Sequence, residues 1–285
     1  MEEPGMEITQ YTVNVPVTEF KNYLWSEEKS PATVEKYVRD ASAFCEYLKD
    51  RPLCKEEVIA YKRNLIQRYA AASVNSMLVS LNCYLRFIKA EGCCVKLLKI
   101  QRQMFCQEDK LLTNAEYKRL VKAADSTRLS LVIQTICGTG IRVSELKYIT
   151  VESVKAGKAS VDCKNKTRVI FIPSRLKKLL KGYAGRTGIK TGPVFITKSG
   201  KPLNRSNIWR EMKALCSRAG VPASKVFPHN LRHLFARTFY SLEKDIVRLA
   251  DLLGHSTVNT TRIYTAETGE NHLSRLERVQ KMLAT

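Results

Sequence analysis

The stretch SPATVEKYVRDASAFCEYLKD, residues 30–50, decides the class of fold for the first part of the chain. Ser30 is a preferred N-cap residue, and Pro31 suits the first helical position because that position needs no N–H donor. Apolar side chains then recur every three or four residues, at Val34, Tyr37, Val38, Ala41, Phe44, Cys45 and Leu48. This period predicts an amphipathic helix with one buried face.

Three neighbouring segments show the same period, so we expect a four-helix bundle. One helix lies near Val17–Trp25, and two more follow in CKEEVIAYKRNLIQRYA (54–70) and SVNSMLVSLNCYLRFIKAEG (73–92). Ser73 is the expected N-cap of the last helix, and Gly92 is expected to close it. A basic face on part of the bundle is predicted from Lys62, Arg63, Arg68, Arg86 and Lys89.

A polar, weakly periodic segment, residues 99–111, separates this bundle from the rest and predicts a linker. The expected organisation is therefore a tail at 1–16, a helical domain at 17–98, and a larger domain at 112–285. The larger domain opens with a helix capped by Thr113, with Glu116 completing a capping box. The apolar stretch RLSLVIQTICGTG (128–140) predicts a second helix that ends at its glycines.

The period changes to two in ASVDCKNKTRVIFIP (159–173), which predicts two short antiparallel strands around an Asn165-Lys166 turn. Helical patterns return after a basic stretch and continue to the C-terminus. The predicted fold is mainly α, with a helical bundle followed by a mostly α domain that holds a small antiparallel sheet.

The charge of the chain is strongly positive and unevenly distributed. The net charge of its 285 residues is +21. Lys and Arg exceed Asp and Glu by about 18 over residues 141–240, whereas residues 241–285 are near neutral and residues 1–60 are acidic. A concentrated positive field favours a polyanionic partner, and nucleic acid is the partner that this charge predicts.

Composition also bears on the compartment. The nine cysteines include no C-x-x-C pair, which favours reduced thiols over disulfides or zinc. The acidic N-terminus, MEEPGMEITQ, has no apolar core of a secretory signal. No window approaches the ~18 uninterrupted apolar residues of a membrane span. We therefore expect a cytoplasmic protein without a membrane partner.

Two cationic motifs in the second domain are candidates for chemistry. In TGIRVSEL (139–146), Arg142 follows a glycine turn, and Glu145 three residues later can hold its guanidinium towards an anion. The alternative is an ordinary surface ion pair. In DCKNKTRV (162–169), Lys164 and Lys166 lie on a hairpin from which a lysine can reach a substrate as a proton donor, unless both are simply solvated.

Histidines and a tyrosine form the other candidates. HNLRH (229–233) places His229 and Arg232 on one helical face, while His229 and His233 could alternatively form a zinc pair. Zinc is disfavoured because the glutamate of an H-E-x-x-H site and a third ligand are missing, so no metal or other cofactor is expected. In LLGHSTVNTTRIYT (252–265), Tyr264 follows His255 by nine residues and is either a reagent or a half-buried tyrosine.

The order of these motifs resembles one known family. TGIRVSEL, CKNKTRV, HNLRH, LLGH and TTRIYT are similar to the successive signatures of the tyrosine recombinases, also called the phage integrase or Xer-type family. The resemblance covers about 110–270 by motif. It implies a SAM-like core-binding domain for the helical bundle and the tyrosine recombinase catalytic fold for the larger domain.

The resemblance implies a role for each motif residue. Arg142 and Arg232 correspond to the paired arginines on the scissile phosphate, Lys164 to the hairpin lysine, His229 and His255 to the two histidines, and Tyr264 to the nucleophile. The hairpin is a residue shorter than the common family form, so Lys166 remains an alternative to Lys164. No histidine follows Tyr264-Thr265 directly, which favours a mobile-element integrase over a housekeeping Xer recombinase.

The implied activity is site-specific recombination through a 3′-phosphotyrosyl intermediate, without ATP or metal. The resemblance further implies a dimer on each DNA site, a tetramer at synapsis, docking of the C-terminal helix on a neighbouring protomer, and room for a directionality or accessory protein. The alternatives are Xer-type dimer resolution, topoisomerase IB-like relaxation, and a catalytically silent DNA-binding accessory protein.

Overall fold

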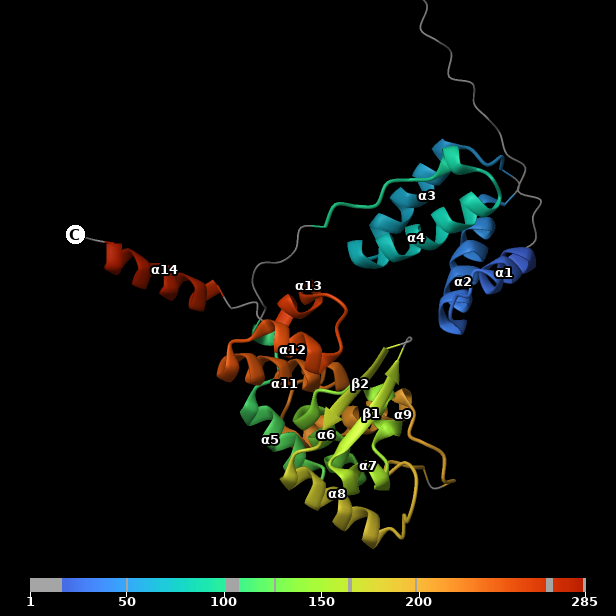
Figure 1. Ribbon diagram of the computed structural model, residues 1–285. Helices are drawn as coiled ribbons and strands as arrows, with labels where there is room; N and C mark the ends of the chain where they lie inside the picture. Colours follow the sequence, from blue (N-terminus) through green and yellow to red (C-terminus); the bar gives the residue numbers. More distant parts are fainter. Residues whose placement is uncertain are drawn as a thin grey trace, which may run out of the picture. The chain divides into compact units, whose positions relative to one another are not determined.

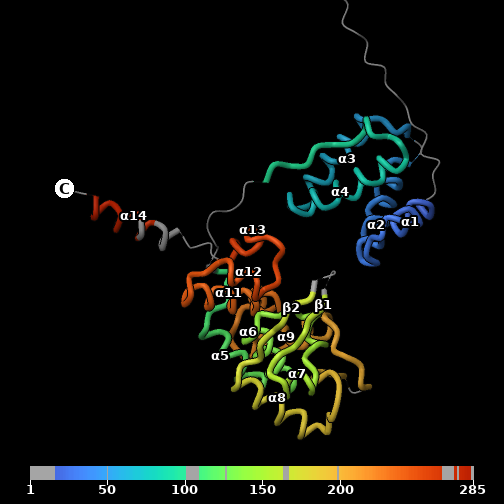
Figure 2. Tube along the Cα trace, viewed as in Figure 1, coloured from blue at the N-terminus to red at the C-terminus, as the bar shows by residue number. Residues whose placement is uncertain are grey.

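The computed structural model describes residues 17–49, 51–100, 108–125, 127–163, 166–197, 199–264 and 269–283. The chain divides into two compact units, Met1–Arg102 and Gln103–Thr285 (Figures 1 and 2). The fold is mainly helical with one antiparallel hairpin, as the sequence predicts. None of the helices in the described ranges is long and apolar enough to cross a membrane.

The first unit is a bundle of four α-helices and a short 3-10 turn, namely α1 (Val17–Ser26), α2 (Pro31–Leu48), α3 (Lys55–Arg68), α4 (Ala71–Phe87) and η1 (Glu91–Cys93). The Ser30 side chain accepts a hydrogen bond from the Thr33 N–H at 3.3 Å, and Pro31 begins α2, which confirms the predicted start. The bundle closes over apolar side chains that include Phe44, Leu78 and Leu81.

The predicted limits of α4 were wrong at both ends. The helix begins at Ala71, so Ser73 lies inside its first turn, because the preceding alanines are strong helix formers and extend the helix backwards. It ends at Phe87, well before Gly92. Lys89 has a φ of 59°, and this left-handed residue turns the chain out of the helix without a glycine.

The second unit is larger and mostly helical. Its elements are η2 (Glu108–Lys110), α5 (Asn114–Ala123), α6 (Arg128–Thr139), η3 (Val143–Tyr148), α7 (Val151–Ala156), β1 (Lys158–Cys163), β2 (Lys166–Phe171), α8 (Ser174–Arg186), α9 (Arg205–Ala214), α10 (Cys216–Ala219), η4 (Ala223–Lys225), α11 (Pro228–Glu243), α12 (Ile246–Leu253), α13 (Val258–Thr261), η5 (Arg262–Tyr264) and α14 (Gly269–Leu283). The predicted capping box of Thr113 and Glu116 is present at the start of α5.

The hairpin differs from the prediction by one residue. Cys163 pairs with Lys166, so Lys166 is the first residue of β2 and does not form a turn with Asn165 as predicted. Residues 164 and 165 lie outside the described residues.

Helix α8 was missed by the sequence reasoning, which left this segment as a basic stretch. Leu176, Leu180 and Ala184 are spaced four residues apart and are buried in the core of the unit. The stripe is narrow and is interrupted by Gly182 and Gly185, which are poor helix formers, so packing rather than local propensity explains the helix.

Helix α6 packs on α11, and this packing brings the candidate site together. Gly140 caps α6 with a φ of 66°, and the chain then turns so that Arg142 caps η3. Helix α12 ends in the same way at Gly254, whose φ is 64°. These two left-handed turns place Arg142 and His255 immediately beyond helix ends, where backbone carbonyls are free to accept hydrogen bonds.

Candidate functional site

Arg232 is the most deeply buried cation of the site, with 1% of its surface exposed. Its guanidinium donates to the carbonyl oxygens of Gly140 at 2.5 Å and Leu253 at 2.7 Å, and approaches His255 Nε2 at 3.1 Å. Burial, with the charge of Arg142 next, lowers the pKa of Arg232 to about 10, while the nearby Tyr264 hydroxyl opposes this shift. Arg232 therefore stays charged at neutral pH.

The carboxylate of Glu145 forms ion pairs with two further arginines, Arg142 and Arg168. Its carboxylate is only 2% exposed and lies 2.9 Å from Arg142 Nη1 and 2.5 Å from Arg168 Nη2. It also accepts the Arg142 backbone N–H at 2.7 Å. One buried carboxylate pairs with two guanidiniums, so Arg142, Glu145 and Arg168 together keep a net positive charge. The side chain of Arg142 is 37% exposed.

The hydrogen bonds of His255 fix its tautomer. Arg232 can only donate, so His255 Nε2 must accept, and the proton must reside on Nδ1, which lies 2.8 Å from Thr261 Oγ1. Burial and the neighbouring guanidinium of Arg232 lower the pKa of His255 to about 4. His255 is consequently neutral at pH 7.

Tyr264 is packed inside this cluster, with 3% of its surface exposed. The His255 ring stacks on its ring at a centroid distance of 5.8 Å, and the His233 ring meets it edge-on at 4.5 Å. Leu249 and Leu253 of α12 pack beside it. The half-buried tyrosine considered from sequence is in fact a buried one, held among polar groups of the site.

His229 and His233 both lie on α11, with ring centroids 4.7 Å apart. Burial lowers the pKa of His229, and Arg232 contributes next. Burial lowers the pKa of His233 to about 4. No group of three or more His, Cys, Asp or Glu side chains that could hold a metal occurs among the residues described, so the His229–His233 pair has no third ligand there.

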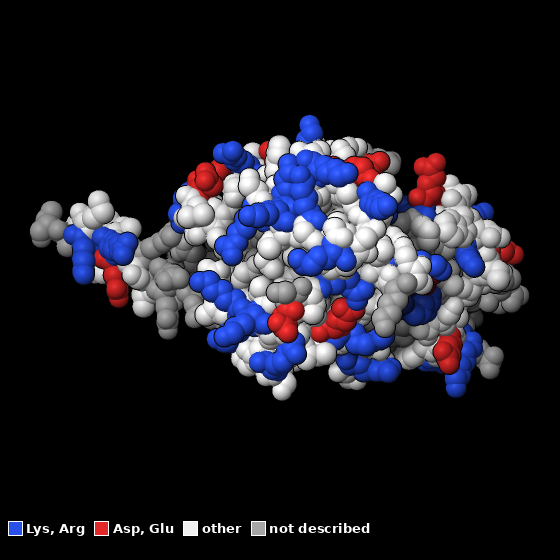
Figure 3. Space-filling view, turned by 90° about the horizontal axis from the view of Figure 1, so that it is seen from below, with Lys and Arg blue, Asp and Glu red and all other residues white. Residues whose placement is uncertain are grey.

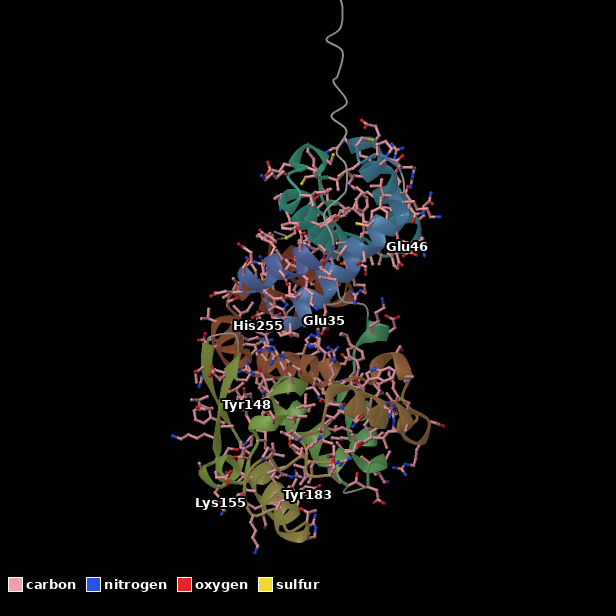
Figure 4. All side chains as sticks on the ribbon, turned by 90° about the vertical axis from the view of Figure 1, so that its right-hand side faces the viewer. Glu35, Glu46, Tyr148, Lys155, Tyr183 and His255 are labelled. Atoms are coloured by element: carbon pink, nitrogen blue, oxygen red, sulfur yellow. The ribbon has the colours of Figure 1, made fainter. Side chains whose placement is uncertain are left out.

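The structure thus brings five predicted residues into one cluster, from four separate segments: Arg142, His229, Arg232, His255 and Tyr264. Lys164 lies outside the described residues, and Lys166 is the first residue of β2. Figure 4 shows His255 at one end of the second unit, away from Tyr183 of α8.

Three contributors to the site were not identified from sequence. Arg168 on β2 was quoted within the hairpin motif but given no role, and it contacts Glu145 and the carbonyl of Leu253. Thr261 Oγ1 lies 2.8 Å from His255 Nδ1 and accepts its N–H. His233 was weighed from the sequence as a disfavoured zinc partner of His229, and it packs on Tyr264. A strand arginine or a threonine carries no distinguishing spacing, so only the fold reveals them.

Comparison with known proteins identifies the chain. The model of the phage integrase family matches residues 110–271, and that of the phage integrase N-terminal SAM-like domain matches residues 17–92. The chain belongs to the phage integrase family. It is accordingly a tyrosine-type site-specific DNA recombinase, which cleaves and rejoins DNA strands.

Individual relatives and solved structures are similar to this chain over most of its length. Tyrosine recombinase XerA of Pyrococcus furiosus is 30% identical over 271 residues, covering 91% of this chain and 92% of the relative. A lambda integrase dimer bound to a COC′ core site matches with a TM-score of 0.72 at 21% identity, covering 90% of this chain and 77% of that chain. XerH bound to its difH substrate matches with a TM-score of 0.69 at 19% identity, covering 93% and 84%. The two structural matches show the fold.

The lowered histidine pKa values of the recombinase predict a loss of stability in acid. In the folded protein the pKa values of His233 and His255 are about 4, against 6.5 for a free histidine. Between pH 4 and pH 6.5 the unfolded chain binds more protons than the folded chain. The free energy of unfolding is therefore full above pH 6.5 and decreases as the pH falls towards 4. We expect the Tm to drop between pH 7 and pH 5 by less in His233→Gln than in the wild type. Equal drops would contradict the placement of His233.

Gly254 offers a test of the turn that positions His255. A Cβ at Gly254 would meet the Arg168 guanidinium, which is tied to Glu145, and the positive φ adds strain of about 1–2 kcal/mol. We expect Gly254→Ala to lower the free energy of unfolding by more than this and to slow DNA cleavage. Gly188→Ala is the matched control, because its φ is also positive and its Cβ would meet nothing within 4 Å. Equal losses in the two variants would refute the close approach.

Proposed function

We propose that Tyr264 is the nucleophile that attacks the scissile phosphate of DNA. A bond forms between the Tyr264 oxygen and phosphorus, and the bond from phosphorus to the 5′-oxygen breaks, which leaves a 3′-phosphotyrosyl link and a free 5′-hydroxyl. The phosphodiester is exchanged rather than hydrolysed, so rejoining needs no ATP. The observation that carries the proposal is the burial of Tyr264 beside Arg232 and His255.

The arginines supply the positive charge that this reaction requires. A phosphodiester is anionic and repels a nucleophile until its charge is neutralised. Each of two guanidiniums can donate a pair of hydrogen bonds to the phosphate oxygens. We assign this role to Arg142 and Arg232. Glu145 and Arg168 hold the Arg142 guanidinium in position through the shared carboxylate.

The histidines are suited to moving or holding a proton near Tyr264. A phenol has a pKa of about 10 and is a weak nucleophile until it loses its proton. His255 is neutral, with Nε2 as its acceptor, and His229 is biased to its neutral form by burial and by Arg232. We infer that His229 and His255 orient the phosphate and the tyrosine, with one acting as acid or base.

The hairpin lysine is assigned as the general acid that protonates the leaving 5′-oxygen. Lys164 is our first choice and Lys166 the alternative. We expect Lys164→Ala to slow cleavage of an ordinary phosphodiester by about 10²–10⁴-fold, and Lys166→Ala to change it much less. A substrate with sulfur at the bridging 5′ position needs no protonation and should restore the rate of the defective variant. Rescue of Lys166→Ala instead would reverse the assignment.

Double-stranded DNA is the proposed substrate, with several protomers acting together on it. The solved relatives include a lambda integrase dimer on a core site and a lambda integrase tetramer on a Holliday junction. Helix α14 exposes Leu273, Leu276 and Val279, each more than half exposed, on one face. We infer that this face docks on a neighbouring protomer, giving a dimer per site and a tetramer at synapsis, with residues 17–98 as the core-binding domain. We place the reaction in the cytoplasm, and a directionality or accessory protein can add regulation.

The test of the proposed function separates recombination from relaxation. The native locus is the DNA that flanks the gene for this protein. A supercoiled plasmid that carries two copies of this locus should yield recombinant products in the presence of the protein, and EDTA should not reduce their yield. Relaxation of plasmids without the locus would favour a topoisomerase IB-like activity. Loss of activity with EDTA would favour a metal-dependent nuclease, and DNA binding without any cleavage would favour an accessory protein.

A further inference from the structure

The outer side of α8 carries a cluster of unpaired cations. Residues 174–190 contain six Lys or Arg and no Asp or Glu. We use the name α8 basic face for the four exposed residues Arg175, Lys178, Lys181 and Arg186, which lie opposite the buried stripe of Leu176, Leu180 and Ala184. Within the described residues, no carboxylate lies within 4.0 Å of any of the four.

Helix stability does not explain most of these cations. The N-terminal turn of a helix favours negative charge, yet α8 has no acidic residue there and carries Arg175 as its second residue. Only Arg186 suits its place, because the last turn of a helix favours a cation. Like charges three residues apart, as in Lys178 and Lys181, destabilise a helix slightly. Lys177 is different, because it packs over Gly157 where α7 ends and therefore has a structural contact. The α8 basic face is thus a set of like charges that has no carboxylate partner among the described residues.

The α8 basic face lies away from the catalytic cluster. Within the second unit, Figure 1 shows α8 at the end opposite α12 and α13, and Figure 4 shows Tyr183 of α8 at the end opposite His255. Figure 3 views the molecule from this lower side, where Lys and Arg side chains outnumber those of Asp and Glu. A duplex held at Tyr264 is therefore not the anion that these cations face.

We propose that the α8 basic face binds the phosphate backbone of a second DNA segment while the first is held at the catalytic cluster. Nucleic acid fits better than a membrane surface, because a helix that binds lipid needs a free apolar face and that of α8 is buried in its own core. A recombinase works where DNA is already concentrated, so even weak backbone contacts would be occupied. This inference does not depend on the roles proposed for Tyr264 and its neighbours.

The experiment is a bridging assay with two random-sequence duplexes. One duplex is fixed to beads and saturated with protein, and capture of a second, fluorescent duplex is measured. The test variant is Lys178→Gln/Lys181→Gln/Arg186→Gln. The matched control, Lys118→Gln/Lys122→Gln/Lys201→Gln, removes three other exposed cations of the same unit. We expect the test variant to capture about tenfold less second duplex, with a shallower salt dependence, since each lost phosphate contact reduces the slope by about 0.9.

The outcomes separate the proposal from its rivals. Loss of bridging in the test variant alone, with binding of the first duplex retained, supports it. Unchanged bridging, equal loss in both variants, or no bridging by the wild type overturns it. If the test variant bridges normally but binds phosphatidylserine vesicles less well than the wild type, the face is a membrane contact and the proposal is wrong.

Discussion

We expect Tyr264→Phe to abolish covalent attachment to DNA while leaving DNA binding intact. The phenyl ring fills the same space against His233, His255 and Leu253, and only the hydroxyl is lost. Because the oxygen is the atom that joins phosphorus, no other group replaces it, and the loss is expected to be on the order of 10⁴-fold or greater. Denaturing gels of protein mixed with DNA from the native locus measure the adduct.

The same variant also distinguishes a catalytic hydroxyl from a structural one. Its Tm is expected to change little, because removing one hydroxyl alters stability by about 1 kcal/mol. A large fall in Tm with loss of DNA binding would assign Tyr264 to the core. An adduct as abundant as that of the wild type would exclude Tyr264 as the nucleophile and would favour the accessory-protein alternative.

The second large effect is expected at Arg232. A lysine at this position keeps one charge, but its single nitrogen cannot occupy the places of both Nη1 and Nη2, which donate to Gly140 and Leu253. We expect Arg232→Lys to slow cleavage by about 10²–10³-fold, as when one preorganised donor is removed from a charged transition state. The free energy of unfolding should fall by about 1–3 kcal/mol, since a buried carbonyl loses its donor.

Arg142→Lys is the matched control for Arg232→Lys. Arg142 is partly exposed, and Arg168 continues to pair with Glu145 when Arg142 changes. We expect similar slowing of cleavage with little loss of stability, because partly exposed ion pairs contribute less than about 1 kcal/mol. Single-turnover cleavage and urea unfolding measure the two quantities. A larger loss of stability in Arg142→Lys than in Arg232→Lys would contradict the observed burial.

Sequence reasoning pointed to candidate residues that stand in motifs. Arg142, Arg232, His255 and Tyr264 sit at turns and helix starts with recognisable spacing, and the fold brings them together with His229. Arg168 could not be predicted, because it is one of several cations near the hairpin, and only the pairing of β1 with β2 directs it to Glu145.

Helices could be predicted where the spacing of apolar residues and the N-cap residues indicated the same start. Ser30-Pro31 and the Thr113 capping box mark the true starts of α2 and α5. The predicted C-terminal end of α4 was wrong because the chain leaves the helix at Lys89, which has a left-handed backbone conformation, and not at a glycine. The amino-acid sequence does not indicate that a lysine adopts this conformation. The buried stripe of α8 has only three residues, which a sequence window does not separate from a basic loop.

The account rests most directly on which atom becomes joined to DNA. We would trap the adduct with denaturant, digest it with protease and nuclease, and identify the modified residue by mass spectrometry. The account predicts a single nucleotide linked through a 3′-phosphate to Tyr264, in wild-type protein only. A phosphate linked to any other residue, or cut DNA with free ends and no linked peptide, would contradict it.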